Sequence, residues 1–157
     1  MDRAVKAKVK ARSVHVVVLT FAFCLFTFAF AACVVDERRQ VPAGAQAAID
    51  RVTEDIHAGR DEKLYEEAAD EWRASVSADE NRRRLEQVRE RLGPVRGRSI
   101  HAGTEKESGT GRLAGHSLVV TYQTTFERAN AMETFTLLER DGRWLLAGYT
   151  VTSDALK

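Results

Sequence analysis

The chain begins with a basic leader and a long apolar run, and these two segments limit which part of it can fold as a domain. Five Lys and Arg residues and one acid precede the run from Val16 to Ala32, which carries no charge. Positive charge stays on the cytoplasmic side of a membrane. As a helix the run would span about 25 Å, short of a hydrocarbon core of roughly 30 Å. We therefore predict an export signal, which leaves the residues after Cys33 to form the domain.

The end of the apolar run, Phe30-Ala31-Ala32-Cys33, resembles the lipobox of bacterial lipoprotein signals. In that pattern an aliphatic residue and two small residues precede an obligatory cysteine, and here Phe30 stands where leucine is usual. The resemblance implies cleavage after Ala32 and a diacylglyceryl group on the Cys33 thiol. Because a single chain of myristoyl size binds a membrane only marginally, a durable anchor needs more than one chain. The predicted partner of the mature N-terminus is therefore the membrane, through this lipid.

Two other interpretations of the segment stay open. Ala29-Phe30-Ala31 also fits an ordinary signal-peptidase site, which would release a soluble secreted protein beginning at Ala32. Alternatively, the segment stays uncleaved as a short membrane anchor. All three interpretations place residues 34–157 outside the cytoplasmic membrane. The favoured division is a signal peptide over 1–32, a lipidated tether over 33–43 and a domain over 44–157, with inner and outer membrane both open.

The charge and cysteine content of the exported part restrict its partners and the source of its stability. Taking the leader's five bases and one acid from totals of 24 and 23 leaves a net charge near −3. Export argues against nucleic acid as a partner. Cys24 would leave with the signal and a lipidated Cys33 cannot pair, so no intramolecular disulfide is available. The hydrophobic core must supply the stability.

Three helices are predicted after the tether. The first, Gly44–Ala58, has apolar residues at helical spacing on one face. The second starts at Asp61, a candidate N-cap, and carries an apolar stripe that ends at Trp72. The third starts at the capping box Ser77-Ala78-Asp79-Glu80 and ends at Gly93-Pro94, where glycine leaves the helix and proline prevents its resumption.

After Gly93-Pro94 the apolar residues recur at the spacing of strands. Val95–Ala102 is a predicted strand, and the glycines between His101 and Gly115 indicate a long loop or irregular hairpin. Apolar and polar residues then alternate from Leu118 to Phe126, which is typical of a half-buried strand.

The last two predicted strands, Met132–Arg140 and Arg143–Thr152, flank Asp141-Gly142. This dipeptide is a strong hairpin signal because both positions tolerate positive φ. A two-residue turn pairs Arg140 with Arg143, and counting back along both strands places Phe135 opposite Gly148.

This order of elements predicts an α+β fold, in which three helices pack on a curved antiparallel sheet of about four strands, preceded by the signal helix. The later part of the chain contains the motifs Arg89-x-x-Leu92-Gly93-x-Val95-x-x-Arg98, Val120-x-Tyr122-x-Thr124-x-Phe126, Glu133-Thr134 and Asp141-Gly142-x-Trp144-x-x-x-Gly148-Tyr149. With these motifs, residues 44–152 resemble the bacterial domain-of-unknown-function family numbered four-zero-one-nine. The resemblance implies a cystatin-like or nuclear-transport-factor-two-like architecture and an exported or lipid-anchored protein, and it implies no activity.

Three residues are candidates for lining a ligand pocket: Tyr122, Glu133 and Tyr149. In a pocket between sheet and helices, one acid and two phenols could perform acid–base chemistry of an isomerase or hydratase kind. The alternative is structural: Glu133 pairs with an arginine at the rim and the tyrosines belong to the core. No nucleophile motif, phosphate loop or metal-ligand spacing accompanies them, so we predict no catalytic residue, no metal site and no cofactor.

The basic residues of the third helix and the following strand admit two interpretations. They form either a solvated face with spaced ion pairs, or a surface for anionic lipid or an acidic partner. The arginines concerned are Arg82, Arg83, Arg84, Arg89, Arg91, Arg96 and Arg98.

Together these patterns predict a lipid-anchored protein of the bacterial envelope whose domain is not an enzyme. Its expected work is to bind an envelope protein or a small apolar ligand. The enzyme alternative requires a water-excluding pocket that contains a perturbed acid. The binding alternative requires an exposed apolar patch or an edge strand.

Overall fold

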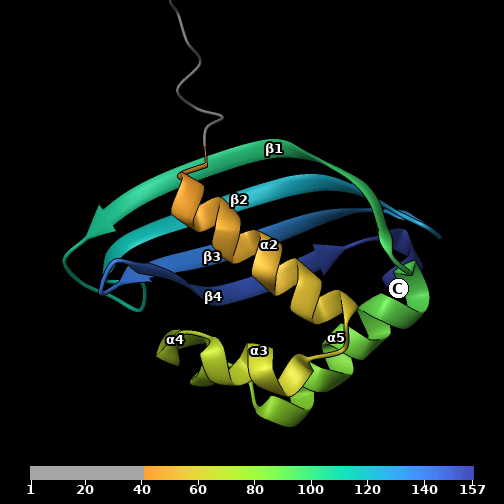
Figure 1. The fold of residues 1–157 in the computed structure, drawn as a ribbon, viewed down its shortest axis with the longest axis horizontal. Coiled ribbons are helices and arrows are strands. Elements are labelled where there is room, and N and C mark those ends of the chain that lie inside the picture. The colour runs from red at the N-terminus through yellow and green to blue at the C-terminus, as the bar shows by residue number, and fades with distance from the viewer. Residues whose placement is uncertain (1–40) are drawn as a thin grey trace, which may run out of the picture. The chain divides into compact units, whose positions relative to one another are not determined.

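The computed structural model describes residues 41–157, which form one α+β unit (Figure 1). The predicted signal peptide, Cys33 and the tether up to residue 40 lie outside the described residues. Four strands form one antiparallel sheet in the order β1-β2-β3-β4, and helices pack against it, which confirms the predicted fold class. The elements are α2 (Ala43–His57), α3 (Asp61–Glu67), α4 (Asp70–Arg73), α5 (Ala78–Leu92), β1 (Val95–Ser108), β2 (Gly115–Phe126), β3 (Asn130–Arg140), β4 (Arg143–Thr152) and η3 (Asp154–Leu156).

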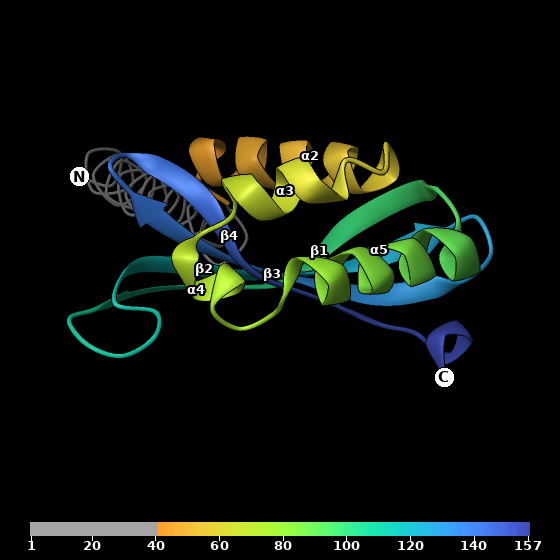
Figure 2. The same ribbon diagram turned by 90° about the horizontal axis from the view of Figure 1, so that it is seen from below.

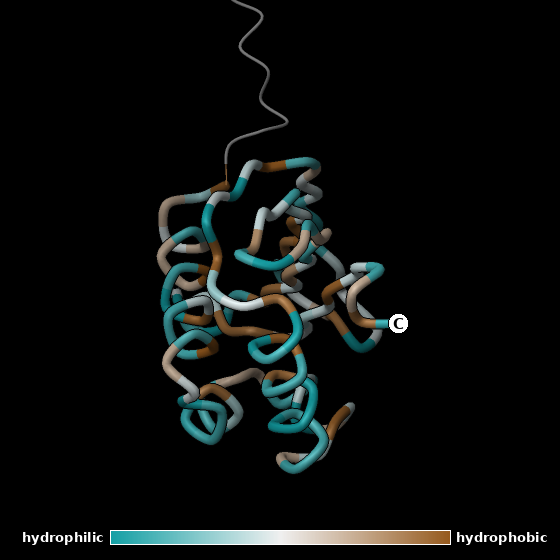
Figure 3. The backbone as a smooth tube through the Cα atoms, turned by 90° about the vertical axis from the view of Figure 1, so that its right-hand side faces the viewer, coloured by the Kyte–Doolittle hydropathy of each residue, from teal (hydrophilic) through white to brown (hydrophobic). Residues whose placement is uncertain are grey.

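The helices form a layer over the sheet, and the core lies between the two. α2 crosses the front of the sheet, whereas α3, α4 and α5 lie on the side of β4 (Figure 1). α3 packs against both α2 and α5 (Figure 2). Hydrophobic and hydrophilic stretches alternate along the helical part of the tube in Figure 3, as expected of helices with one buried face. The core joins Ile49 of α2, Leu64 of α3 and Leu85 of α5 to Phe135 and Leu137 of β3.

α5 begins and ends where its sequence signals predict. The Ser77 hydroxyl accepts a hydrogen bond from the Glu80 backbone N–H at 3.2 Å, and Gly93 leaves the helix with a φ of 76°. The Glu80 carboxylate does not return to Ser77 as in a full capping box, because it binds Arg83 and Arg84 instead. The buried face of the helix consists of Asn81, Leu85, Val88 and Leu92.

The second predicted helix is in fact two, α3 and α4, because the chain becomes extended at Ala68 and Ala69, with ψ of 161° and 151°. The Ala69 N–H donates to the Leu146 carbonyl of β4 at 2.8 Å. Two alanines favour a helix by propensity, so this contact with the sheet overrides the local preference. Asp61 is not the N-cap either: it lies in the first turn, and its carboxylate accepts two hydrogen bonds from Arg89, at 2.5 and 2.6 Å.

β1 is longer than predicted. It continues to Ser108 and pairs with β2 from Val95, opposite Phe126, to Ser108, opposite Gly115. Only residues 109–114 form the connection, so of the two forms predicted for 101–115 the structure shows the hairpin and not the long loop. Residues 101–107, which suggested a loop, are all exposed. They therefore lack the alternation of apolar and polar side chains by which a half-buried strand is recognised in a sequence.

The β3–β4 hairpin has the predicted turn and, near it, the predicted pairing. Asp141 and Gly142 have φ of 51° and 72°, and Arg140 pairs with Arg143. Beyond Leu137 the register shifts by one residue, so Gly148 lies opposite Thr136, and Phe135 lies opposite Tyr149. The predicted pairing of Phe135 with Gly148 is therefore wrong, because an extra residue in β4 forms a bulge there.

Within residues 41–157, none of the helices has the length and apolar character needed to cross a membrane.

Candidate functional site

Glu133 lies at the centre of a buried polar cluster that takes one residue from each strand and one from α2. We call this set the Glu133 cluster. The carboxylate is 2% exposed, and it faces inward from the middle of β3 beneath the helices. The members of the cluster are Thr53 of α2, Arg98 of β1, Thr124 of β2, Glu133 of β3 and Tyr149 of β4.

Both carboxylate oxygens of Glu133 accept hydrogen bonds within this cluster. Tyr149 donates its hydroxyl to one oxygen at 2.7 Å. The other oxygen accepts from Thr124 and from Nε and Nη2 of Arg98, the latter two at 3.0 and 2.7 Å. Arg98 also donates to the Thr53 hydroxyl at 2.9 Å, and its side chain is only 14% exposed. The buried carboxylate is thus paired with a guanidinium, and side-chain donors bind both of its oxygens.

The two tyrosines of the predicted set have separate partners. Tyr149 belongs to the Glu133 cluster, and burial together with the negative charge of Glu133 raises the pKa of its hydroxyl well above the usual range. Tyr149 therefore keeps its proton at neutral pH and acts as a donor. Tyr122 donates instead to the Gln46 side chain of α2 at 2.9 Å, and burial raises the pKa of its hydroxyl as well. The ring of Tyr122 still contacts the cluster, because the Arg98 guanidinium lies 5.2 Å from its centroid.

The cavity beside the Glu133 cluster is small. It has a volume of about 30 Å³ and touches Glu133 and Tyr149 on one side and Val88 of α5 on the other. A cavity of this size holds about one water molecule. The Glu133 cluster therefore fits the structural alternative, an acid paired with an arginine, although the pair lies in the core and not at the rim.

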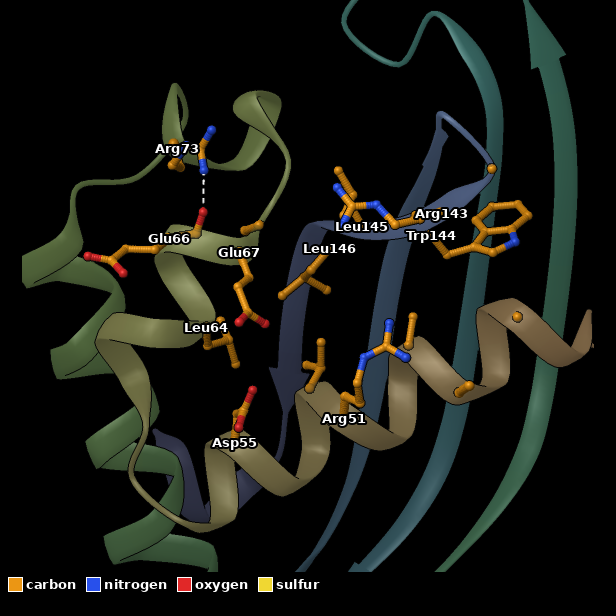
Figure 4. A pocket seen from close by; sticks show the side chains of 16 residues that line it. Arg51, Asp55, Leu64, Glu66, Glu67, Arg73, Arg143, Trp144, Leu145 and Leu146 are labelled. Atoms are coloured by element: carbon orange, nitrogen blue, oxygen red, sulfur yellow. Dashed lines mark hydrogen bonds between the residues drawn. The ribbon is translucent and has the colours of Figure 1, made fainter.

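A larger cavity lies elsewhere, between α2, α3 and the start of β4 (Figure 4). We call it the α2–β4 groove. Its volume is about 740 Å³, which is within the usual range for ligand sites of about 300–1,000 Å³. Apolar side chains form part of its lining, among them Ala48 and Val52 of α2 and Leu146 of β4. Trp144 lies at the end nearest the start of α2, where Gly44 lets the ring approach the helix closely.

The acidic side chains of the groove lie at the end formed by α3, and two of them have cationic partners. Asp55 accepts from Arg60 at 2.5 Å and from Lys63 at 2.8 Å. Burial by itself would raise the pKa of Asp55, but the hydrogen bonds from Lys63 and Arg60 outweigh it and lower that pKa. Glu67 also lies 3.4 Å from Lys63. This end of the groove is therefore largely neutralised by the protein itself.

The opposite end of the groove is basic. Arg51 extends from α2 and Arg143 lies at the start of β4, so the two guanidinium groups border the same part of the groove (Figure 4). Both residues are exposed. Within residues 41–157, neither guanidinium has an ion-pair or hydrogen-bond partner. An anion entering the groove would therefore meet two positive charges that no side chain of the described part of the chain pairs with.

The histidines do not form a metal site in the part of the chain that the structure describes, where no group of three suitable ligands occurs. His116 of β2 has a different role, because Glu139 contacts its Nδ1 at 2.6 Å and Glu105 contacts its Nε2 at 2.5 Å. These hydrogen bonds, that of Glu139 first, raise the pKa of His116 above 6.5. The His116 side chain thus links β1, β2 and β3, and its ring lies 4.9 Å from that of Trp144.

The arginines of the third predicted helix and β1 are mostly paired, which favours the solvated face over a lipid-binding surface. Arg91 binds two C-terminal carbonyl groups. The remaining arginines of the set have carboxylate partners, and the pairs are Arg82–Asp79, Arg83–Glu80, Arg84–Glu80, Arg89–Asp61, Arg96–Glu127 and Arg98–Glu133.

Sequence reasoning missed Arg98 in the Glu133 cluster and the two arginines of the α2–β4 groove, Arg51 and Arg143. Arg98 was grouped with the surface arginines, although its position two residues before Ile100 places both on the inward face of β1. Arg51 and Arg143 had no local signal, because only the packing of α2 on β4 brings them to one groove. Tyr122, Glu133 and Tyr149 do come together around Phe135, whose ring contacts both tyrosines.

Comparison with known proteins yields one family. The model described as Protein of unknown function (DUF4019) matches residues 48–149, which is more than half of the chain. The matched region runs from the middle of α2 to Tyr149 and so contains the whole Glu133 cluster and most of the α2–β4 groove. No curated protein matches the chain.

Proposed function

The chain belongs to the DUF4019 family of proteins of unknown function, and we propose that it is an envelope lipoprotein whose domain binds a ligand without catalysis. The α2–β4 groove is the proposed binding site. The Glu133 cluster, in this proposal, holds the sheet and α2 together and supports the groove from within the core.

The observation that carries the proposal is the contrast between the two cavities. The groove has about 740 Å³, a partly apolar lining and charged groups that border it. The cavity at Glu133 has about 30 Å³, and both oxygens of that carboxylate are already bound by side chains. A general acid or base needs access to a substrate atom within hydrogen-bond reach. The enzyme alternative therefore has less support than the binding module.

A groove-blocking variant tests the binding proposal independently of ligand charge. Ala47 is exposed on α2 and lines the groove, so Ala47→Trp fills the cavity without replacing a core residue. A mixture of small organic acids, bases and neutral compounds is offered to the full chain, and binding is followed by ligand-observed NMR. We expect hits whose signals are lost in Ala47→Trp and kept in the control Ala78→Trp, on the exposed first turn of α5. Hits that survive Ala47→Trp would contradict the proposal.

The lipoprotein part of the proposal rests on the segment that ends at Cys33, outside the described residues. It is supported by the resemblance of Phe30-Ala31-Ala32-Cys33 to a lipobox. Cells that express the chain are labelled with radioactive palmitate, and Cys33→Ala is compared with the matched control Cys24→Ala. We expect label in the wild type and the control and none in Cys33→Ala. Equal labelling of all three chains would refute lipidation at Cys33 and leave the soluble or uncleaved alternatives.

The helices on one side of a four-stranded antiparallel sheet also support a cystatin-like architecture for the domain, and we propose it on that basis.

A further inference from the structure

We propose that the ligand of the α2–β4 groove is an organic anion, a carboxylate with an apolar body, whose charged group lies between Arg51 and Arg143. This inference rests on the proposed binding function and adds the chemical class of the ligand. Two observations carry it: the unequal neutralisation of the two ends of the groove, and the apolar surface between them.

The charges of the groove favour an anion over a cation. At the α3 end, Asp55 is held by Arg60 and Lys63, and Glu67 lies beside Lys63. A cationic ligand there would compete with bonds that the protein already makes. At the other end, Arg51 and Arg143 have no such partners within residues 41–157, so an anion gains charge-assisted hydrogen bonds without breaking any. The groove is therefore expected to attract an anionic ligand more strongly than a cationic one.

The remaining acid of the groove does not change this balance. Glu66 lines the cavity, but its carboxylate points away from the two arginines, and its backbone carbonyl accepts from Arg73 (Figure 4). Arg73 in turn pairs with Asp70. The basic end thus has no acidic side chain of the groove directed toward it.

The chemistry of the two cations suits a planar oxyanion. A guanidinium presents several N–H donors in a fixed fork that matches a carboxylate, and it does not lose its charge at physiological pH. Two such groups from different elements approach the anion from different directions. They can therefore fix its position as well as attract it, which one flexible lysine would do less well.

The apolar surface next to the arginines would receive the rest of the ligand. Ala48 and Val52 of α2 and Leu146 of β4 line the groove. Trp144 lies at the side nearest the start of α2. A purely inorganic anion would leave this surface in contact with water. A carboxylate that carries an aromatic or aliphatic group would cover it and add the free energy of burying apolar area.

The test compares three probes that share an apolar body and differ in charge: phenylbutyrate, phenylbutyramide and phenylbutylamine. Binding to the full chain in nanodiscs of zwitterionic phosphatidylcholine is measured by calorimetry, and the signal from empty nanodiscs is subtracted. We expect phenylbutyrate to bind about tenfold more tightly than the amide, which corresponds to one charge-assisted pair partly screened by solvent. The preference should weaken as salt is raised, since exposed charges are screened.

The variant Arg51→Gln/Arg143→Gln should bind the acid and the amide alike, whereas the control Arg82→Gln/Arg83→Gln on α5 should keep the preference. Equal binding of acid and amide by the wild type would overturn the inference while leaving a binding groove. Preference for phenylbutylamine would overturn it in favour of the acidic end. Binding of none of the three would also overturn it, and the proposed function would then be judged by the Ala47→Trp experiment, which does not depend on ligand charge.

Discussion

Replacing Glu133 by glutamine keeps the shape of the side chain but removes the negative charge that faces Arg98. The two side chains are 2% and 14% exposed, and the guanidinium also contacts the rings of Tyr122 and Phe135 at 5.2 and 5.3 Å. The guanidinium therefore has little access to water that could replace the lost partner. Leaving one member of a buried pair uncompensated costs about 3–5 kcal/mol.

The companion variant Arg98→Met removes the positive charge and should cost a similar amount, because Glu133 then remains buried with only neutral donors. The double variant contains no buried charge. A glutamine at 133 can accept from one of the two hydroxyls, Thr124 or Tyr149, through its carbonyl oxygen and donate its amide N–H to the other. We therefore expect the double variant to be more stable than the sum of the single effects implies, with a coupling free energy of at least ~2 kcal/mol. For a domain of this size, a loss of 3 kcal/mol lowers Tm by about 12 °C.

The coupling is measured by urea unfolding of the four chains in a double-mutant cycle. The control is the same cycle on Arg82 and Asp79, an exposed pair three residues apart on α5, for which a coupling of about 0.5 kcal/mol or less is expected. A coupling below about 1 kcal/mol for Arg98 and Glu133 would refute the view that these two residues form an ion pair that is shielded from water.

Two further changes test the sheet. His116 has a raised pKa, so its contribution to stability is present below pH 6.5 and is lost as the pH rises through the folded-state pKa. The unfolding free energy of the wild type minus that of His116→Gln should therefore fall as the pH rises above 6.5, and a difference that is flat with pH would contradict the role of Glu139 and Glu105. A Cβ at Gly148 would lie 3.2 Å from Cβ and Oγ1 of Thr136, so Gly148→Val should lower Tm, and Thr136→Ala should restore part of the loss if the observed register is right.

Much of the fold could be predicted because local signals and tertiary packing agree there. The hydroxyl of Ser77, the positive φ of Gly93 and the Asp141-Gly142 turn are all consequences of short-range chemistry. The alternation from Leu118 to Phe126 likewise follows from one buried face, and the structure confirms it. These features depend on residues that lie within a few positions of one another.

The errors arose where a distant segment decides the local structure. Ala68 and Ala69 leave the helix because the Ala69 N–H binds a carbonyl in β4. The bulge near Thr136 shifts the β3–β4 register by one residue, and counting residues back from the turn cannot detect that shift. The candidate site shows the same limit. The sequence allowed Glu133 and Tyr149 to be chosen as candidates, because an acid and a phenol occupy inward positions of their strands. The arginine that binds Glu133 could not be chosen in this way, because it comes from a distant strand, β1.

The hydrogen bond from Ala69 to Leu146 has a consequence for association between molecules. It occupies a backbone acceptor on the outer edge of β4. A strand of another molecule therefore cannot add to the sheet at that position without displacing this hydrogen bond. On the opposite edge, β1 presents exposed Lys106 and Glu107, and charges of this kind oppose edge-to-edge aggregation.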